Sequence, residues 1–194
     1  MFITLPLSVT LNAQQLSIPD PHFLSALIEA GVDIDGSGTV ERDEASPVRC
    51  LNISDKNIRD LSGIWAFTSL TVLDCSRNSL TELDISGNTS LEILCCAVNE
   101  ISFLDLSENP ALTDLICCFN GIAGLDLSGN RSLRFLDCSA NRLGSLDVSR
   151  NPMLEFLNCH DTRLETLHLN YNPSLKYLSC SFNYFRRSLF QQVR

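Results

Sequence analysis

The chain has 194 residues, 44% of them hydrophobic, and carries a formal net charge of −9 at neutral pH. This length and composition allow a substantial buried core. The acidity, with an isoelectric point near 4.7, opposes binding to nucleic acid or to anionic lipid, so we expect no nucleic-acid partner. No apolar stretch is long enough to span a bilayer, and we expect no membrane insertion.

The first residues, MFITLPLSVTLNAQQ, include an apolar stretch that ends near Ala13. About ten apolar residues match the length of a signal-peptide core. The basic residues that usually precede such a core are missing, so a disordered or strand-like leader is the alternative. We expect residues 1–15 to be a signal or leader segment of an exported protein.

Residues 33–44, DIDGSGTVERDE, have the spacing of an EF-hand calcium loop, with Gly38 at its sharp turn. Oxygen donors occupy the ligand positions: Asp33, Asp35, Ser37, the carbonyl of Thr39, Glu41 and Glu44. Hard oxygen ligands at alternate positions, ending in a carboxylate with two oxygens, suit Ca²⁺. We therefore expect Ca²⁺ as a structural cofactor. An acidic turn without a metal is the alternative.

A helix is predicted just before this loop, in DPHFLSALIEAG. Asp20 is its expected N-cap, Pro21 its first residue, and Gly31 ends it. Val40, at the eighth loop position, would normally pair with a second loop, and the sequence contains none. We expect residues 16–47 to form a small helical EF-hand-like cap on the segment that follows.

From Leu70 the sequence aligns with itself every 21 residues, as in SLTVLDCSRNSLTELDISGNT (69–89) and SLEILCCAVNEISFLDLSENP (90–110). A divergent unit precedes these, in which Leu51 matches Leu73. Each unit splits into two halves with the spacing LxxLxLxxN, so we expect two short extended segments per unit. Stacked at the parallel-strand spacing of about 4.8 Å, such units bury a continuous core that no single unit could close. The fold class is therefore a solenoid of short parallel strands.

The pattern resembles the 21-residue class of leucine-rich repeats, LxxLxLxxNxLxxLDLxxN, which is common in bacterial surface proteins. The resemblance covers residues 48–183 and implies a secreted or cell-surface location. The repeat pattern does not continue through residues 184–194. We expect either an irregular C-terminal cap, in which Phe185, Leu189 and Phe190 cover the last coil, or a truncated repeat.

Six of the nine cysteines recur every 21 residues at an inward position: Cys75, Cys96, Cys117, Cys138, Cys159 and Cys180. A buried free cysteine behaves as a small hydrophobe, so we expect a packed column without thiol chemistry. Cys95 and Cys118 have the opposite parity and should face outward, too far out of register to form a disulfide. The position of Cys50 is undetermined.

Polar residues also recur in columns. We expect two asparagine columns to satisfy backbone groups where the chain turns: Asn78, Asn99, Asn120, Asn141 and Asn183 in the first, and Asn88, Asn109, Asn130, Asn151 and Asn172 in the second. Thr162 interrupts the first column, which predicts a looser or reshaped turn. An outward column of Asp84, Asp105, Asp126 and Asp147 should accept hydrogen bonds from nearby serines or backbone groups; a cation-binding strip is the alternative.

Solvent-facing positions on the presumed concave sheet carry aromatic residues in three successive units. Exposed apolar rows often mark binding surfaces, although stacked aromatic rings also stabilise a sheet by themselves. Polar residues occupy the next outward positions. The candidate ligand-binding residues are Phe135, Phe156, Tyr177, Asp137, Asn158 and His160.

By analogy of fold alone, we expect a binding or adhesion module with a protein ligand; a carbohydrate ligand and a structural spacer within a larger surface protein are the alternatives. Ser139 and His160 share a register on adjacent turns, which superficially suggests a nucleophile and a base. The open surface offers no evident oxyanion donors and no water-excluding pocket, so we expect no enzymatic activity.

Overall fold

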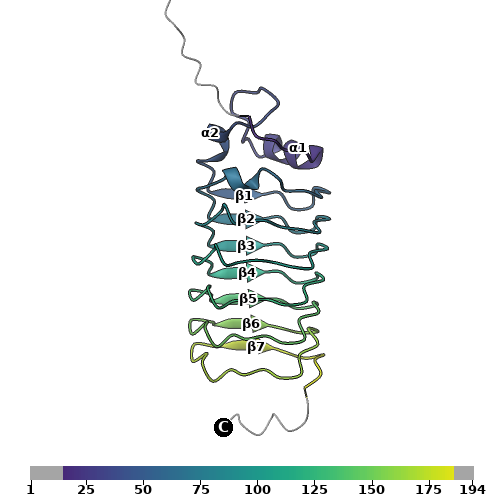
Figure 1. The fold of residues 1–194 in the computed structure, drawn as a ribbon, viewed down its shortest axis with the longest axis vertical. Helices are drawn as coiled ribbons and strands as arrows, with labels where there is room; N and C mark the ends of the chain where they lie inside the picture. Colours follow the sequence, from purple (N-terminus) through teal and green to yellow (C-terminus); the bar gives the residue numbers. More distant parts are fainter. Residues whose placement is uncertain (1–14, 186–194) are drawn as a thin grey trace, which may run out of the picture.

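The computed structural model describes residues 15–185. They form an elongated stack of coils with two short helices at the N-terminal end (Figure 1). The predicted leader (1–15) and the predicted C-terminal cap or truncated repeat (184–194) fall almost entirely outside the described residues, and both stay predictions. Within residues 15–185, no helix combines the length and the apolarity needed to cross a bilayer.

The coils form one sheet of seven parallel strands, in which each strand pairs with its neighbours in the sequence. The strands are β1 (Cys50–Asn52), β2 (Val72–Asp74), β3 (Ile93–Cys95), β4 (Asp114–Ile116), β5 (Phe135–Asp137), β6 (Phe156–Asn158) and β7 (Tyr177–Ser179). Leu51 lies opposite Leu73, and Leu73 lies opposite Leu94. The register predicted from the repeat is confirmed, including that of the divergent first unit.

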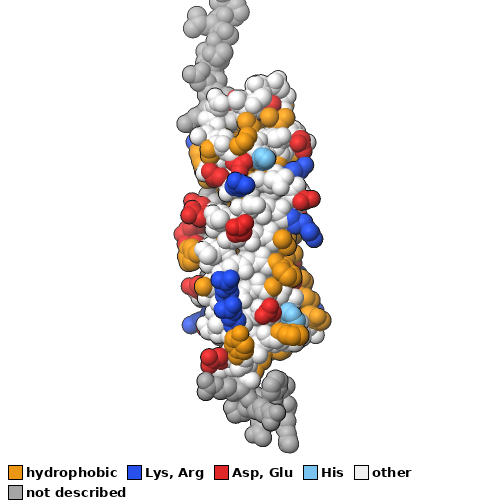
Figure 2. Space-filling view, turned by 90° about the vertical axis from the view of Figure 1, so that its right-hand side faces the viewer, with side chains coloured by type: hydrophobic (Ala, Val, Ile, Leu, Met, Phe, Trp, Pro, Cys, Tyr) orange, Lys and Arg blue, Asp and Glu red, His pale blue; other side chains and the backbone are white. Residues whose placement is uncertain are grey.

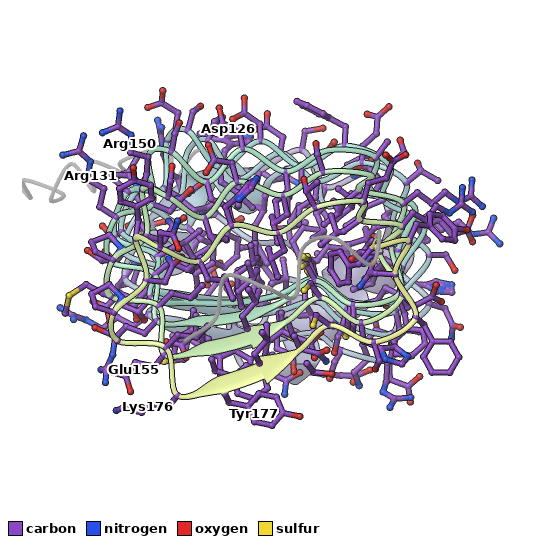
Figure 3. All side chains as sticks on the ribbon, turned by 90° about the horizontal axis from the view of Figure 1, so that it is seen from below. Asp126, Arg131, Arg150, Glu155, Lys176 and Tyr177 are labelled. Carbon is purple, nitrogen blue, oxygen red and sulfur yellow. The ribbon has the colours of Figure 1, made fainter. Side chains whose placement is uncertain are left out.

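The second half of each repeat forms no strand within the described residues, contrary to the expectation of two extended segments per unit. These halves instead contain local Asp-x-Ser turns. The carboxylate of Asp84 accepts hydrogen bonds from the N–H (3.0 Å) and the hydroxyl (2.7 Å) of Ser86, and Asp105 accepts one from the N–H of Ser107 (2.9 Å). The same contact follows β2, where Asp74 accepts from the N–H of Ser76 (3.0 Å), so it does not by itself prevent a strand. The sheet therefore covers one side of the solenoid, here called the sheet face, and irregular chain covers the opposite side, the back face (Figure 3).

Leucine and cysteine fill the interior between the two faces. The central leucines of β2 to β6 are fully buried, as are five members of the cysteine column: Cys75, Cys96, Cys117, Cys138 and Cys159. Cys180, on the last turn, is partly buried, and all nine cysteines are free thiols. Burial raises the pKa of Cys159 to about 12 and that of Cys117 well above its ordinary value. The column packs as small hydrophobic side chains, as expected.

The asparagine columns join successive turns. Asn99 accepts a hydrogen bond from the N–H of Leu80 (3.0 Å) and donates to the carbonyls of Cys75 and Cys96 (3.1 Å each). In the second column each amide N–H₂ donates to two carbonyls of the preceding turn. The Oδ1 atom is buried without a hydrogen-bond partner in Asn88, Asn109, Asn130, Asn151 and Asn172.

The residue before each position of the first column has left-handed backbone dihedrals. Its φ lies between 51° and 57° in Arg77, Val98, Phe119, Ala140, Asp161 and Phe182. None of these is glycine, and for a β-branched valine this region is unfavourable. The N–H of Val98 donates to the carbonyl of Cys118 on the next turn (2.9 Å). Repeated bonds between turns thus hold the backbone in a conformation that its own side chains disfavour.

Thr162 reshapes its turn rather than loosening it. The side chain is fully buried, and its hydroxyl donates to the carbonyl of Cys159 (2.7 Å), in place of the bond that an asparagine amide makes in other turns. A second left-handed residue, Arg163 (φ 64°), follows Thr162. The N–H of Gly144 donates to the carbonyl of Thr162 (3.1 Å).

The N-terminal residues cover the first coil. Helix α1 (Pro21–Glu29) buries Phe23, Ala26 and Leu27 in the same hydrophobic cluster as the repeat leucines. Helix α2 (Arg42–Ala45) is a single turn, and a 3-10 helix, η1 (Ile64–Ala66), lies in the first repeat. The carbonyl of Val40 accepts a hydrogen bond from the N–H of Leu16 (2.9 Å). Val40, the loop residue that would pair with a second EF-hand loop, is thus hydrogen-bonded to the segment that precedes α1.

Asp20 joins this cap to the repeats. Its Oδ1 accepts hydrogen bonds from the N–H groups of His22 (2.7 Å) and Phe23 (3.2 Å), which confirms it as the N-cap of α1. Its Oδ2 accepts two more from Arg59 (2.7 Å) and Asp60 (3.1 Å) in the first repeat. Burial raises the pKa of Asp20, but these four N–H groups outweigh burial and lower it below its ordinary value.

Replacing Asp20 with alanine is expected to lower the free energy of unfolding by about 2–4 kcal/mol, because α1 loses its cap and buried N–H groups lose their acceptor. Chemical denaturation at neutral pH measures the change. Glu100→Ala is the control and should cost about 0.5 kcal/mol or less, because this exposed carboxylate makes no hydrogen bond or ion pair with any of residues 15–185. Equal losses in the two variants would contradict the role given to Asp20.

Candidate functional site

The sheet face carries the aromatic residues that the sequence predicts as a binding surface. Phe135, Phe156 and Tyr177 begin β5, β6 and β7, and the parallel register places them opposite one another. The ring centroids of Phe135 and Phe156 are 4.2 Å apart with 7° between the ring planes, and those of Phe156 and Tyr177 are 4.4 Å apart with 5° between them. The rings cover one another's faces and turn their edges to solvent. These three residues are here called the aromatic strip.

A ladder of opposite charges runs beside the aromatic strip. The carboxylate of Glu155 lies 2.6 Å from the guanidinium of Arg134 on one neighbouring turn and 2.6 Å from the ammonium of Lys176 on the other. Hydrogen bonds from Lys176 and Arg134 lower the pKa of Glu155. Figure 3 shows Glu155, Lys176 and Tyr177 projecting from the coil on the sheet side. Because such exposed pairs stabilise a fold only slightly, their main effect is to fix a charged border along the strip.

The polar candidates Asp137, Asn158 and His160 lie on the same face, as the register requires. The amide of Asn158 donates to Oδ2 of Asp137 (3.1 Å), and the ring of His160 lies tilted against that of Phe182, with centroids 4.9 Å apart. The structure thus brings all six candidate ligand-binding residues to one surface; their role in binding stays a prediction.

The supposed nucleophile and base do not meet. The hydroxyl of Ser139 donates to Oδ1 of Asp137 (2.6 Å), and Nδ1 of His160 lies 2.9 Å from the hydroxyl of Ser181. No hydrogen bond among residues 15–185 joins Ser139 to His160. The pair therefore lacks the contact through which a base activates a nucleophile.

The acidic loop, residues 33–44, gathers carboxylates around a tight turn. Asp33, Asp35 and Glu44 each present an oxygen, and these oxygens lie within 4.8 Å of one another. Asp33 accepts hydrogen bonds from the N–H groups of Ser37 (3.0 Å) and Gly38 (2.9 Å), which close the turn. The donors are all oxygens, as a hard divalent cation requires.

Glu41 and Glu44 concentrate negative charge at the end of this loop. Contact with the side chain of Glu44 raises the pKa of Glu41, whose Oε2 is buried without a hydrogen-bond partner. Burial raises the pKa of Glu44, but backbone N–H groups of Glu41, Ile34 and Asp35 outweigh it and lower the pKa overall. A bound cation would relieve this crowding of carboxylates, so the residues present fit Ca²⁺.

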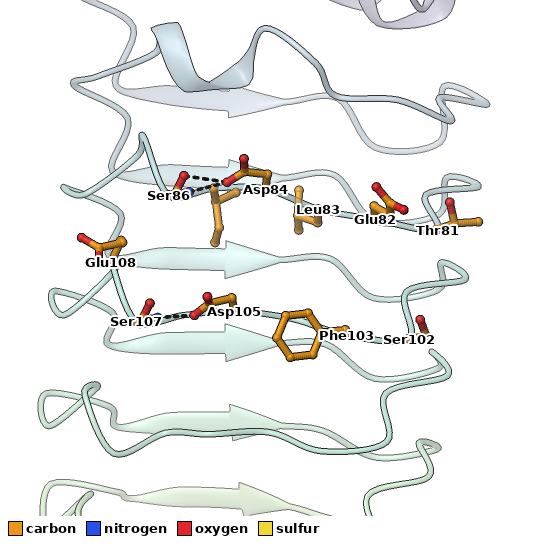
Figure 4. A pocket seen from close by; sticks show the side chains of 11 residues that line it. Thr81, Glu82, Leu83, Asp84, Ser86, Ser102, Phe103, Asp105, Ser107 and Glu108 are labelled. Carbon is orange, nitrogen blue, oxygen red and sulfur yellow. Dashed lines mark hydrogen bonds between the residues drawn. The ribbon is translucent and has the colours of Figure 1, made fainter.

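The back face contains hollows that sequence reasoning missed. One of about 400 Å³ is bordered by Phe103 and by the carboxylates of Glu82, Asp84 and Asp105 (Figure 4). It lies among the second-half segments, which no strand ladder closes. The only sequence signal is the Phe103 side chain itself, because neighbouring turns carry glutamate, glycine or serine at that position.

Comparisons with known proteins agree with this geometry. No family model matches the chain. Internalin J of Listeria monocytogenes is 33% identical over 71 residues, which are 37% of this chain and 8% of that protein. The solved functional domain of InlJ from Listeria monocytogenes, described as including a cysteine ladder, is 29% identical with a TM-score of 0.62, over 88% of this chain and 48% of that one. The comparisons support a bacterial leucine-rich-repeat protein.

Two more distant structures show the same leucine-rich-repeat fold. A leucine-rich-repeat protein of Leptospira interrogans has a TM-score of 0.69 at 22% identity, over 74% of this chain and 40% of that one. An internalin C2 of Listeria monocytogenes has a TM-score of 0.65 at 19% identity, over 90% of this chain and 91% of that one. The chain spans less than half of the InlJ domain and less than a tenth of the whole internalin J.

Proposed function

We propose that the chain is a binding module of an exported or cell-surface protein and that it recognises a protein ligand through the aromatic strip. The observation that carries the proposal is the strip itself, a partly exposed apolar ridge with a fixed charged border, which is most open at Tyr177 (51% exposed). An apolar centre within a polar rim is the usual anatomy of a protein–protein interface. The likeness to internalins and the apolar leader favour the surface location.

The stacking geometry favours a protein ligand over a carbohydrate. A sugar ring packs against the free face of an aromatic ring, whereas the faces within this stack are covered by the neighbouring rings. Only the outer faces of the two end rings, Phe135 and Tyr177, are uncovered by the stack. Ring edges beside the ion pairs of Glu155 instead suit the mixed apolar and charged surface of a protein.

Replacing the aromatic strip by alanine is expected to abolish capture of a specific protein. Immobilised wild type and the triple variant Phe135→Ala, Phe156→Ala, Tyr177→Ala would each be mixed with extracellular material, and retained proteins quantified by mass spectrometry. We expect retention of at least one protein to fall about tenfold or more, because buried aromatic residues dominate interface energies.

The control for this experiment is Tyr171→Ala, which removes an exposed tyrosine that lies neither in the aromatic strip nor in the hollows of the back face. Circular dichroism of each variant checks that the fold persists. If the triple variant retains the same proteins in the same amounts as the wild type, the aromatic strip is not a binding surface, and the chain is better described as a structural spacer.

We also propose that Ca²⁺ stabilises the N-terminal cap through the acidic loop. The side chains of Asp33, Asp35, Ser37, Glu41 and Glu44, with the carbonyl of Thr39, would supply the ligands. The convergence of three carboxylates and the unpartnered oxygen of Glu41 support this proposal. The loop lies just before the first coil, and its last residues belong to α2. A bound ion that fixes the loop would therefore also stabilise the rest of the cap.

Calcium is expected to raise the melting temperature. At ten times its dissociation constant, Ca²⁺ adds about 1.4 kcal/mol, or about 3–5 °C for a chain of this size. Scanning calorimetry in a chelator and in about 5 mM Ca²⁺ measures the shift, since a single loop of this kind binds in the millimolar range or somewhat tighter.

Asp35→Asn tests the ligand role directly, because asparagine can still accept the hydrogen bond from the N–H of Ser37 but loses the charge. The calcium shift should then fall by more than half, whereas Asp60→Asn, outside the loop, should preserve it. A shift that is absent in the wild type, or equal in the two variants, would refute calcium binding at this loop.

A further inference from the structure

Three hollows follow one another along the back face. The first, of about 410 Å³, lies beside Trp65; the second and third enclose about 400 and 720 Å³. The first two share Glu82 and Asp84 as walls, and the second and third share Phe103 and Asp105. These three adjoining hollows are together called the back-face groove.

Every charged residue that borders the back-face groove is acidic. The set is Asp60, Glu82, Asp84, Asp105, Glu108, Asp126 and Asp147. Hydrogen bonds from the serine two residues later lower the pKa of four of them: Asp84, Asp105, Asp126 and Asp147. Arg131 and Arg150 lie on this side of the molecule but border none of the three hollows (Figure 3). Figure 2 shows several acidic side chains along one edge of the molecule, with further acidic, basic and hydrophobic ones scattered over the face in view.

Two exposed aromatic side chains stand in this acidic groove. Trp65 is 46% exposed and Phe103 is 71% exposed. The guanidinium of Arg42 lies 5.1 Å from the centre of the Trp65 ring, which shows that this ring already packs with a cation. Beyond Phe103 lies the third hollow, the most voluminous of the three, which Gly124 and Ser145 help to line. Apolar anchors therefore alternate with negative charge along the groove.

One residue beside the third hollow has a buried polar atom without a partner. Asn130 borders this hollow, is 1% exposed, and has a buried Oδ1 without a hydrogen-bond partner. All five members of its column share that unpartnered oxygen, which is shielded from solvent in each of them. The carboxylates and the aromatic rings, and not this oxygen, are therefore the groups that the groove presents to a ligand.

We propose that the back-face groove binds an extended peptide segment of a partner protein in which basic and apolar side chains alternate. Basic side chains would meet the aspartate column, and apolar ones would pack on Trp65 and Phe103. The groove crosses five turns, which at about 4.8 Å per step is about 19 Å, or about six residues of extended chain. The sheet face plays no part in this interaction.

Trp65 supplies the measurement, because it is the only tryptophan in the chain. The probe is a blocked eight-residue peptide of alternating arginine and leucine, titrated into the full chain at low salt while Trp65 fluorescence is recorded. We expect a saturable change that weakens as salt is added, since exposed charges are screened. A peptide of alternating glutamate and leucine should produce no saturable change.

Variants assign the effect to the groove. The double variant Glu82→Lys, Asp105→Lys should weaken binding about tenfold or more, by replacing attraction with repulsion. The matched control Glu92→Lys, Asp114→Lys makes the same change of net charge on the sheet side and should weaken it about twofold at most. Phe103→Ser should weaken binding about fivefold without changing the charge.

Three results would overturn the proposal. The first is the absence of a saturable Trp65 signal with the basic peptide. The second is equal weakening by the groove and sheet-side variants, which would reduce the effect to net charge. The third is preferential binding of a peptide with the sequence of residues 186–194, which has three arginines and no acidic residue, because it would assign the groove to a second copy of the chain. Loss of the aromatic strip changes none of these readouts, so this proposal and the proposed function fail separately.

Discussion

In-register stacking of the 21-residue turns is the constraint on which the rest of the structure depends. Parallel strands bring each residue opposite its counterpart one repeat later, so a side chain that suits one turn must also suit its copies above and below. The register buries leucine and cysteine in rows and lets one asparagine amide serve two turns, as Asn99 does. The same constraint stacks Phe135, Phe156 and Tyr177 into a partly exposed ridge.

The two faces differ because their backbone hydrogen bonds differ. On the sheet face the strands satisfy one another, and side chains project in ordered rows with fixed borders. On the back face the described chain forms local turns, such as that of Asp84 and Ser86, and no strand pairs. No strand ladder closes this side among the described residues, and the hollows lie there, lined with charge. One repeat thus builds two surfaces of contrasting chemistry.

The sequence predicts the features that depend on period alone. The strand register, the buried cysteine column and the first asparagine column follow from spacing and parity, and the N-cap role of Asp20 follows from the local motif in which Pro21 comes next. Sequence spacing does not predict the second contact of Asp20. Its Oδ2 accepts a hydrogen bond from the first repeat, 39 residues away, and this contact depends on how the cap packs. Likewise, nothing in the identity of Val98 or Phe119 predicts a left-handed backbone, because bonds to the next turn impose it. The candidate ligand residues follow from parity, but the back-face groove does not, since it arises from side chains that differ between turns.

Thiol accessibility in the native protein tests the central claim most directly, because cysteines lie on both sides of the same backbone. In the structure Cys50 is exposed, and Cys95, Cys118 and Cys180 are partly exposed. An excess of a small thiol reagent at about pH 8, followed by mass spectrometry of peptides, should modify these four. It should leave Cys75, Cys96, Cys117, Cys138 and Cys159 unmodified until denaturant is added. The adjacent pair Cys117 and Cys118 decides the matter: the account predicts protection of the first and modification of the second, whereas equal reactivity would contradict an in-register interior.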